Sequence, residues 1–317
     1  MTQPERQQPA RRPTAPDGLV IVDKPQGWTS HDVVARMRRL AGTRKVGHAG
    51  TLDPMATGVL VVGIGRATRL LTYVVGADKE YLATVRLGVT TTTEDAEGET
   101  LAVTDASRLA HDDVVAAAVP LTGDVQQVPS AVSAIKVDGQ RAYARVRAGE
   151  QVELAARPVT ISTIEVGDLR AAEVDGTGVV DVDVRVVCSS GTYVRAIARD
   201  LGDALGVGGH LTALRRTRVG GYTLSQARTI DDLAQTSDDV PLDVLGLADA
   251  ARATFPVREL TEAEARALSY GQAIDADDAA VASSGATTAA IGPDGTLVAL
   301  VEARAGRVRP ALVFAPA

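Results

Sequence analysis

The sequence predicts an α+β protein built around a large mixed sheet, with a small β-rich module at its C-terminal end. Valines alternate with charged residues from 180 to 188, which is typical of a half-buried strand. Val33, Met37 and Leu40 recur at the spacing of one helical face. From about residue 245 a short helical segment is followed by several short apolar runs, which indicates a separate module.

The composition limits the class of protein. A chain of 317 residues with 45% hydrophobic content can bury a large core and has room for two domains. Its single cysteine cannot form an internal disulfide, and the four histidines are scattered, which argues against a metal cluster. We see no signal-peptide pattern and no run of about 18 apolar residues, so we expect a cytoplasmic protein that does not span a membrane.

The net charge of −7 is unevenly distributed along the chain. Residues 1–230 hold 27 basic and 26 acidic residues, whereas residues 231–317 hold 6 and 14. The basic residues of the first part cluster at Arg36, Arg38, Arg39, Arg44 and Lys45, at Arg141, Arg145 and Arg147, and at Arg215, Arg216 and Arg218. Each cluster alone is typical of a solvated helix face, but together they favour a polyanionic partner.

The N-terminal part of the chain can be divided into an arm, a strand and a helix. Residues 1–17 offer almost nothing to bury, which predicts a disordered arm. Residues 18–23 are typical of a short strand. Thr29 and Asp32 then match a variant of the capping box, so a helix should begin there and leave its arginines facing outward.

The segment from 47 to 60 combines glycines, a proline and threonines around His48 and Asp53, and it runs into an apolar strand. We therefore expect a tight loop that presents the Asp53 carboxylate from a rigid base. Pro54 restricts the backbone of Asp53 towards extended geometry. On local pattern alone, an aspartate before proline is more often a turn residue.

The middle of the chain gives weaker signals. We expect a strand over 83–89, a loop over 90–98, a helix over 105–120 and an exposed hairpin-like excursion over 126–140, followed by a helix that carries Arg141 and Arg145. The strand over 180–188 ends in a Ser-Ser-Gly-Thr turn, and the helix after it has Tyr193 and Arg195 in its first turn. Cys188 alternates with the valines and should be a core residue.

Several short motifs follow one another in an order that resembles a known protein family. The Asp53 loop, Lys79-Glu80-Tyr81, Gln127-Val128-Pro129-Ser130, Gly191-Thr192-Tyr193-Val194-Arg195 and Leu214-Arg215-Arg216 follow one another in the chain. Over roughly residues 18–230, the sequence resembles the bacterial tRNA pseudouridine synthases of the TruB type. The resemblance implies an enzyme that isomerises uridine at position 55 in the T loop of tRNA after flipping the base out of the loop.

The resemblance also implies a fold: a pseudouridine-synthase-like mixed, mainly antiparallel sheet with flanking helices. It implies a catalytic domain over 18–244, an RNA-gripping insertion over about 124–157 and a small PUA-like domain over 245–317. The expected partner is the T stem-loop of tRNA, and we expect a monomer.

Site residues follow from the same resemblance. Asp53 matches the catalytic aspartate, and Arg195 matches the arginine that pairs with it. Tyr81 matches the aromatic that stacks on the flipped base, and His48, Tyr193 and Leu214 match positions that contact the RNA. Lys136, Arg141 and Arg145 could approach phosphates. Asp95 either orients Arg195 or is a solvated loop carboxylate.

The residue types at this site also allow ordinary structural roles and a function without catalysis. Arg195 could pair only with Asp200 or another helix neighbour, and Tyr81 and Tyr193 could be ordinary core aromatics. The cross-class alternative is a protein that binds or folds RNA without catalysis.

The chemistry agrees with these residue types. Conversion of uridine to pseudouridine breaks one glycosidic bond and forms another without a change of redox state, so we expect no cofactor and no metal. It needs a positioned anion, a pocket that retains the detached base and energy to extrude a nucleotide. Asp53 could attack either the base or the ribose, and the sequence does not choose between them.

Overall fold

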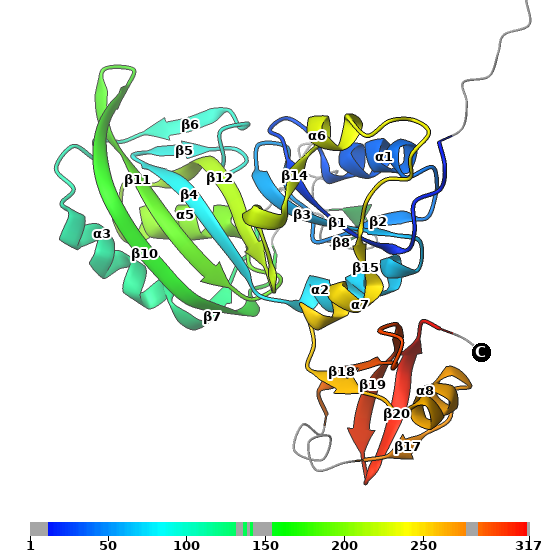
Figure 1. The fold of residues 1–317 in the computed structure, drawn as a ribbon. Helices are drawn as coiled ribbons and strands as arrows, with labels where there is room; N and C mark the ends of the chain where they lie inside the picture. The colour runs from blue at the N-terminus through cyan, green and yellow to red at the C-terminus, as the bar shows by residue number, and fades with distance from the viewer. Residues whose placement is uncertain (1–11, 131–135, 138–139, 142–153, 277–284, 316–317) are drawn as a thin grey trace, which may run out of the picture.

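The computed structural model describes residues 12–130, 136–137, 140–141, 154–276 and 285–315. Within these ranges the chain forms one eleven-stranded mixed sheet, a separate five-stranded sheet and two short β-ribbons (Figure 1). No helix in this part of the chain is long and apolar enough to cross a bilayer.

The large sheet consists of β1 (Gly18–Lys24), β2 (Val46–Ala49), β3 (Thr57–Ile64), β4 (Lys79–Leu87), β7 (Gly123–Gln127), β10 (Arg157–Val174), β11 (Thr177–Cys188), β12 (Gly209–Val219), β13 (Tyr222–Thr223), β14 (Arg228–Thr229) and β15 (Leu245–Gly246). Its main order is β14-β1-β3-β12-β4-β11-β10-β7, with β2 on β3, β15 on β1 and β13 on β12. The pairs β1/β14 and β3/β12 are parallel, and the remaining pairs are antiparallel. The predicted mixed, mainly antiparallel sheet is therefore confirmed.

The flanking helices are α1 (Ser30–Leu40), α2 (Leu71–Gly76), α3 (His111–Ala118), α5 (Val194–Ala204), α6 (Ile230–Ala234), α7 (Leu247–Arg252) and α8 (Glu262–Ser269), with 3₁₀ turns η1 (Gly65–Arg69), η2 (Val119–Leu121) and η3 (Leu224–Gln226). The ribbons pair β5 (Val89–Thr91) with β6 (Thr100–Val103) and β8 (Lys136–Val137) with β9 (Gln140–Arg141).

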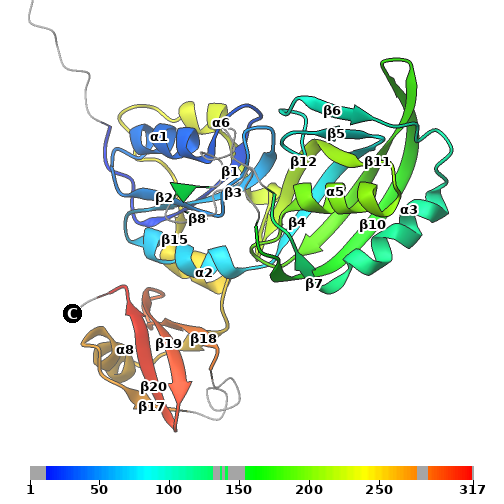
Figure 2. The same ribbon diagram turned by 180° about the vertical axis from the view of Figure 1, so that it is seen from behind.

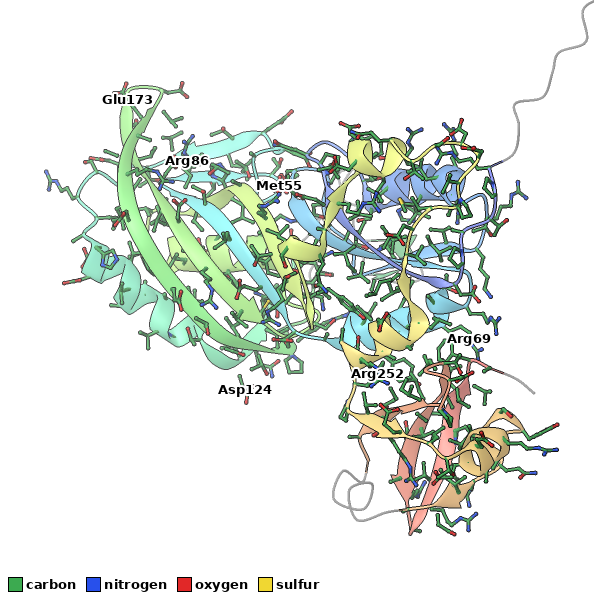
Figure 3. All side chains as sticks on the ribbon, viewed as in Figure 1. Met55, Arg69, Arg86, Asp124, Glu173 and Arg252 are labelled. Atoms are coloured by element: carbon green, nitrogen blue, oxygen red, sulfur yellow. The ribbon has the colours of Figure 1, made fainter. Side chains whose placement is uncertain are left out.

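A short parallel contact joins two halves of the large sheet. β3 and β12 pair through Arg215 with Thr57 and Arg216 with Gly58. One half contains β1, β2 and β3, and the other contains β12, β4, β11 and β10. Figure 3 shows Met55, which follows Asp53 by two residues, where these two halves meet. The geometry of the sheet thus places the predicted catalytic loop at this junction.

The first half-sheet is covered on both faces. Val20 and Val22 of β1 pack with Met37 of α1, whereas Leu19 and Ile21 belong to a second apolar cluster on the other face. The predicted cap of α1 is confirmed. The Thr29 hydroxyl accepts a hydrogen bond from the Asp32 amide at 3.1 Å, and the Asp32 carboxylate accepts one from the Thr29 amide at 2.9 Å.

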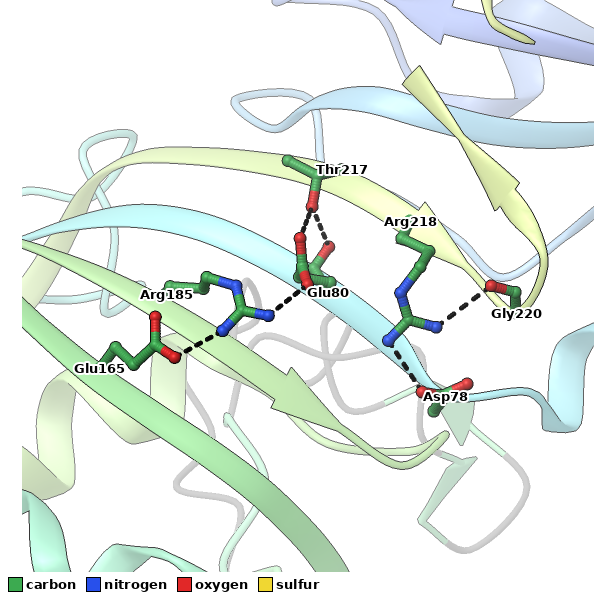
Figure 4. A network of polar contacts seen from close by, with 7 residues as sticks. All are labelled: Asp78, Glu80, Glu165, Arg185, Thr217, Arg218 and Gly220. Carbon is green, nitrogen blue, oxygen red and sulfur yellow. Dashed lines mark hydrogen bonds and ion pairs between the residues drawn. The ribbon is translucent and has the colours of Figure 1, made fainter. Parts of the chain in front are cut away.

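The second half-sheet is covered on one face, by α5 and α3. Alternate residues of β4 and β11 form the core there, and Cys188 is among these buried side chains as predicted. The opposite face carries paired charges, as Figure 4 shows. Arg185 donates hydrogen bonds to Glu80 at 2.8 Å and to Glu165 at 2.7 Å, and Arg218 pairs with Asp78. This pairing lets charged residues cover an open sheet face.

Several local predictions were wrong. The helix expected over 105–120 is α3 alone, because the Asp105 carboxylate accepts a hydrogen bond from the Ser107 amide in a turn before the helix. The loop expected over 90–98 begins inside β5, which pairs with β6. Only the first two residues of the excursion expected over 126–140 differ, since they belong to β7, and its described part contains the antiparallel ribbon β8/β9. Arg141 lies in strand β9 and not in a helix.

The C-terminal sheet has the order β16-β18-β19-β20-β17, formed by β16 (Val257–Glu259), β17 (Ile274–Asp275), β18 (Thr287–Ile291), β19 (Leu297–Arg304) and β20 (Arg307–Val313). Figure 1 shows α2 and α7 between this sheet and the first half-sheet, and Figure 2 shows α2 there from behind. Phe314 shares an apolar cluster with Leu19 and Val61, and Arg66 donates a hydrogen bond to the Phe314 carbonyl at 2.6 Å. The predicted β-rich C-terminal part is confirmed.

Candidate active site

The Asp53 loop, residues 50–56, connects β2 to β3. Gly50 and Gly58 flank it with φ values of +81° and +99°, which side chains of L-residues rarely adopt. At Gly58 a Cβ would also lie 2.2 Å from the carbonyl oxygen of Arg216. These glycines therefore let the loop turn tightly where the two half-sheets meet.

Two side chains, Ser30 of α1 and Lys24 of β1, hold the loop through hydrogen bonds to its backbone. The Ser30 hydroxyl, at the start of α1, accepts a hydrogen bond from the Leu52 amide at 2.9 Å. The Lys24 ammonium, which is fully buried, donates to the carbonyls of Pro25, Trp28 and Pro54. Burial lowers the pKa of Lys24 to about 8. The backbone on both sides of Asp53 is thus fixed before any substrate binds.

Asp53 pairs with Arg195. The guanidinium Nε lies 3.0 Å from Oδ2 of Asp53, and the side chain of Arg195 is only 6% exposed, whereas that of Asp53 is 37% exposed. The carboxylate is therefore open to solvent on one side and held by a buried cation on the other. The alternative in which Arg195 pairs only within its helix is wrong, because Arg195 contacts Asp53 and Asp95, both outside that helix. Asp200 pairs with Arg199 instead.

The acidic turn between β5 and β6 fixes Arg195 from the far side. Nη1 of Arg195 lies 3.6 Å from Oδ2 of Asp95 and donates a hydrogen bond to the Thr93 carbonyl at 3.0 Å. Asp95 is 3% exposed, so it is not a solvated loop carboxylate. The guanidinium of Arg195 thus lies between the carboxyl groups of Asp53 and Asp95, which fix it from two sides.

An apolar floor lies beside this ion pair. Tyr81 and Leu214, each 7% exposed, belong to one cluster with Leu52, Met55 and Val194. Burial raises the pKa of the Tyr81 phenol, so the hydroxyl is neutral near pH 7. Tyr81, Leu214, Asp53 and Arg195 are thus brought together from four separate segments of the chain.

His48 and Tyr193 lie on elements that lead to the site. His48 is half-buried in β2, and its ring meets that of His31 edge to face at 5.9 Å between centroids. Burial, followed by the nearby positive charges of His31 and Arg216, lowers the pKa of His48. Tyr193 precedes α5, and its amide donates to the Gln127 side chain at 2.8 Å. Gln127 therefore ties β7 to the start of the helix that carries Arg195.

The insertion residues are only partly described. Arg157 pairs with Gln127 at the base of the insertion, which joins β7 to β10. Lys136 and Arg141 lie in the two strands of the ribbon β8/β9, and the structure does not describe their side chains. Arg145 lies outside the described residues. Their proposed contacts with phosphates stay predictions.

The sequence did not reveal the role of Arg216. This side chain is 1% exposed, and it donates hydrogen bonds to the carbonyls of Val59 at 2.7 Å and Gly50 at 3.1 Å. It therefore bridges both ends of the Asp53 loop and is not part of a solvated basic cluster. Its neighbours are also paired, Arg215 with Asp23 and Arg218 with Asp78. The sequence offers no signal for this role, because Arg216 lies in the run Arg215-Arg216-Thr217-Arg218, which is typical of a solvated basic cluster.

Within the described ranges, His, Cys, Asp and Glu side chains do not gather in threes as metal ligands would. The site offers a carboxylate, a buried guanidinium and a neutral phenol beside an apolar surface. This combination can hold a planar, uncharged group against an anionic nucleophile.

Comparison with known proteins gives consistent matches along the chain. Residues 38–194 match the TruB family pseudouridylate synthase N-terminal domain. Residues 195–244 match the tRNA pseudouridylate synthase B C-terminal domain, and residues 255–315 match the tRNA pseudouridine synthase II C-terminal domain. The three matches follow one another without overlap.

Whole-chain relatives agree with these domain matches. The chain is 61% identical over 303 residues to tRNA pseudouridine synthase B of Arthrobacter sp. (strain FB24), covering 94% of this chain and 97% of the relative. It is 62% identical over 306 residues to tRNA pseudouridine synthase B of Paenarthrobacter aurescens (strain TC1), covering 94% and 95%. A chain in the crystal structure of a Cbf5-Nop10-Gar1 complex superposes with a TM-score of 0.67 at 26% identity, covering 94% and 85%. The chain therefore belongs to the TruB family of pseudouridylate synthases and is an isomerase.

Proposed function

We propose that this enzyme converts uridine to pseudouridine at position 55 in the T loop of tRNA, and that Asp53 is its nucleophile. The observation that carries this proposal is the 3.0 Å contact between Asp53 and the buried Arg195 at the junction of the two half-sheets. The tRNA substrate is supported by the names of two relatives that are more than 60% identical to this chain over the aligned residues.

The proposed reaction balances without an external reagent. The bond between N1 of the base and C1′ of the ribose breaks, and a bond between C5 and C1′ forms. C5 loses a proton, N1 gains one, and no electrons leave the nucleoside. Asp53 supplies the nucleophile that separates these two events, either at the ribose or at the base.

Each neighbouring residue has a proposed role in this sequence. Arg195 holds the Asp53 carboxylate in a fixed orientation, because its buried guanidinium lies 3.0 Å from one carboxylate oxygen. Tyr81 stacks on the flipped base, a contact worth about 1–3 kcal/mol for such pairs. Leu214, His48 and Tyr193 contact the extruded nucleotide or the loop that it leaves. Asp95 holds Arg195 in place.

The experiment is a map of pseudouridine over a full-length, unmodified tRNA transcript after incubation with excess enzyme. We expect modification at position 55 and nowhere else. The matched control is the same transcript with cytidine at position 55, which should stay unmodified.

Two outcomes would contradict the proposal. Pseudouridine at another position would show that the site reads a different RNA structure. Tight binding of the transcript with no pseudouridine at any position would favour the alternative, in which this chain acts on RNA without catalysis.

A further inference from the structure

A group of five basic residues lies at the C-terminal end of α1 and in the turn after it. We call Arg36, Arg38, Arg39, Arg44 and Lys45 the α1 patch. Arg36 is half-buried, and the other four are exposed. The helix buries Val33, Met37 and Leu40 against the sheet, so its arginines lie on the solvent side.

The charge of the α1 patch is not compensated within the described part of the chain. None of its five side chains makes an ion pair or a side-chain hydrogen bond there. Several other arginines on the surface of the catalytic part do have acidic partners: Arg66 pairs with Asp17, Arg86 with Asp181, and Arg170 with Asp183. Five adjacent cations without such partners produce a local positive potential despite the overall charge of −7.

Two segments of backbone connect the α1 patch to the Asp53 loop. α1 begins at Ser30, which holds Leu52, and Arg39 lies nine residues further, about 13 Å along a helix. β2 runs back from Lys45 to Ala49, about 13 Å along a strand, and ends where the loop begins. α1 and β2 pack together, and both place the α1 patch about 13 Å from the Asp53 loop.

An acidic segment bounds the α1 patch on one side. α6 packs against α1, and Asp231 and Asp239 lie on or just after this helix. Arg12 and Asp238 pair across the same border. Repulsion from this segment would keep a polyanion away from α6 and favour its approach along β2, towards the loop.

We infer that the α1 patch binds backbone phosphates of the T stem, a few base pairs from the nucleotide at Asp53. The inference rests on the proposed function, since the stem reaches the patch only when the T loop occupies the site. A stem offers a continuous row of phosphates at the distance that α1 and β2 both set, and arginines bind phosphates without reading sequence. The patch therefore supplies affinity and register and takes no part in the chemistry.

The test compares two double substitutions that remove the same charge. Arg38→Gln with Arg39→Gln changes the α1 patch. Arg304→Gln with Arg309→Gln, on exposed positions of β19 and β20, is the control. Binding of a T-stem-loop hairpin is measured from about 50 to 200 mM salt, together with the single-turnover rate at saturating enzyme. Thermal unfolding checks that each variant is folded.

We expect the patch variant to bind three- to tenfold more weakly near 100 mM salt and to lose about 2 from the slope of log Kd against log salt. Its saturating single-turnover rate should equal that of the wild type. The control variant should keep the wild-type slope. Arg44→Gln with Lys45→Gln should reproduce the patch effect in a second background that does not alter the helix.

Equal slopes in the patch and control variants would overturn the inference. So would a weakened affinity for full-length tRNA with an unchanged affinity for the hairpin, because the patch would then contact another part of the tRNA. Binding is measured separately from product. Normal binding slopes with no pseudouridine in the wild type would therefore count against the proposed function and not against the patch.

Discussion

Arg216 is a buried cation whose hydrogen bonds end on the backbone at both ends of the Asp53 loop. On β12 it lies opposite Tyr81 of β4 and beside Gly58 of β3, so one side chain connects the three segments that form the junction. Arg215, the next residue along the strand, points the other way and is 40% exposed. The two arginines form a natural pair for comparison.

Arg216→Met should lower the free energy of unfolding by about 1–3 kcal/mol, because two buried carbonyls would lose their donor. Arg215→Met removes a half-exposed ion pair and should cost less than about 1 kcal/mol. Urea unfolding of both variants gives the comparison. Equal losses of unfolding free energy in the two variants would show that burial does not determine how much Arg216 contributes to stability.

Lys24 predicts a pH effect on stability. Its pKa is lowered to about 8 by burial, so above pH 8 the folded protein gives up this proton while the unfolded chain still holds it. More protons bound in the unfolded state means that stability rises with pH. This gain in stability is complete above the pKa that Lys24 has in the unfolded chain, and it is lost as the pH falls through 8.

The measurement is the difference in unfolding free energy between the wild type and Lys24→Met at pH 8 and at pH 9. We expect the wild type to gain relative to the variant over this interval. Lys45→Met, at an exposed position, serves as the control and should follow the wild type. If the difference in unfolding free energy stayed constant from pH 8 to 9, Lys24 would titrate outside this pH range.

Among the elements, those with a regular local period could be predicted from the sequence. α1, β11 and α5 have unbroken spacing of apolar residues, and the structure contains all three. β10 and β12 were missed because bulges shift their register, in β10 between Val166 and Leu169 and in β12 between Leu211 and Ala213. A buried arginine in β12 further hides the alternation.

The candidate active site was harder to predict from the sequence than the helices and strands. Asp53 and Arg195 are far apart in the chain, and no local pattern sets a contact over such a separation. The resemblance of the motifs, and not their spacing, suggested the pair. The structure then added Lys24, Gln127 and Arg216, whose partners are backbone groups that a sequence does not display.

Gly58 tests how closely the two half-sheets must approach. Gly58→Ala would place a Cβ 2.2 Å from a β12 carbonyl at φ +99°, so we expect a loss of about 3 kcal/mol or more. Gly27→Ala has a similar φ of +80° but no atom within 4 Å, and should cost about 1 kcal/mol. Chemical denaturation of both variants gives the two costs. Similar losses would show that backbone strain, and not the close approach, dominates.

Across the whole molecule, the point in the chain where the acidic excess begins differs from the boundary between the two packed domains. The acidic excess lies after residue 230, whereas the α1 patch and the Asp53 loop lie in the first part. The domain boundary proposed at residue 245 falls just before β15, which pairs with β1 of the large sheet. α7 packs on β1 as well, which favours a boundary nearer to residue 253. The large sheet and the C-terminal sheet thus share one apolar core through Phe314.

The central proposal assigns the chemical step to the Asp53 carboxylate that Arg195 holds. Asp53→Asn keeps the shape of the side chain and removes its charge, so the RNA should still bind while the nucleophile is lost. The most direct measurement is single-turnover formation of pseudouridine at position 55 by this variant, with the affinity for the transcript measured in parallel. Asp112→Asn, on the exposed face of α3, is the control. We predict that Asp53→Asn lowers the rate by about 10³-fold or more with little change in affinity, and a rate within tenfold of the wild type would contradict the assignment.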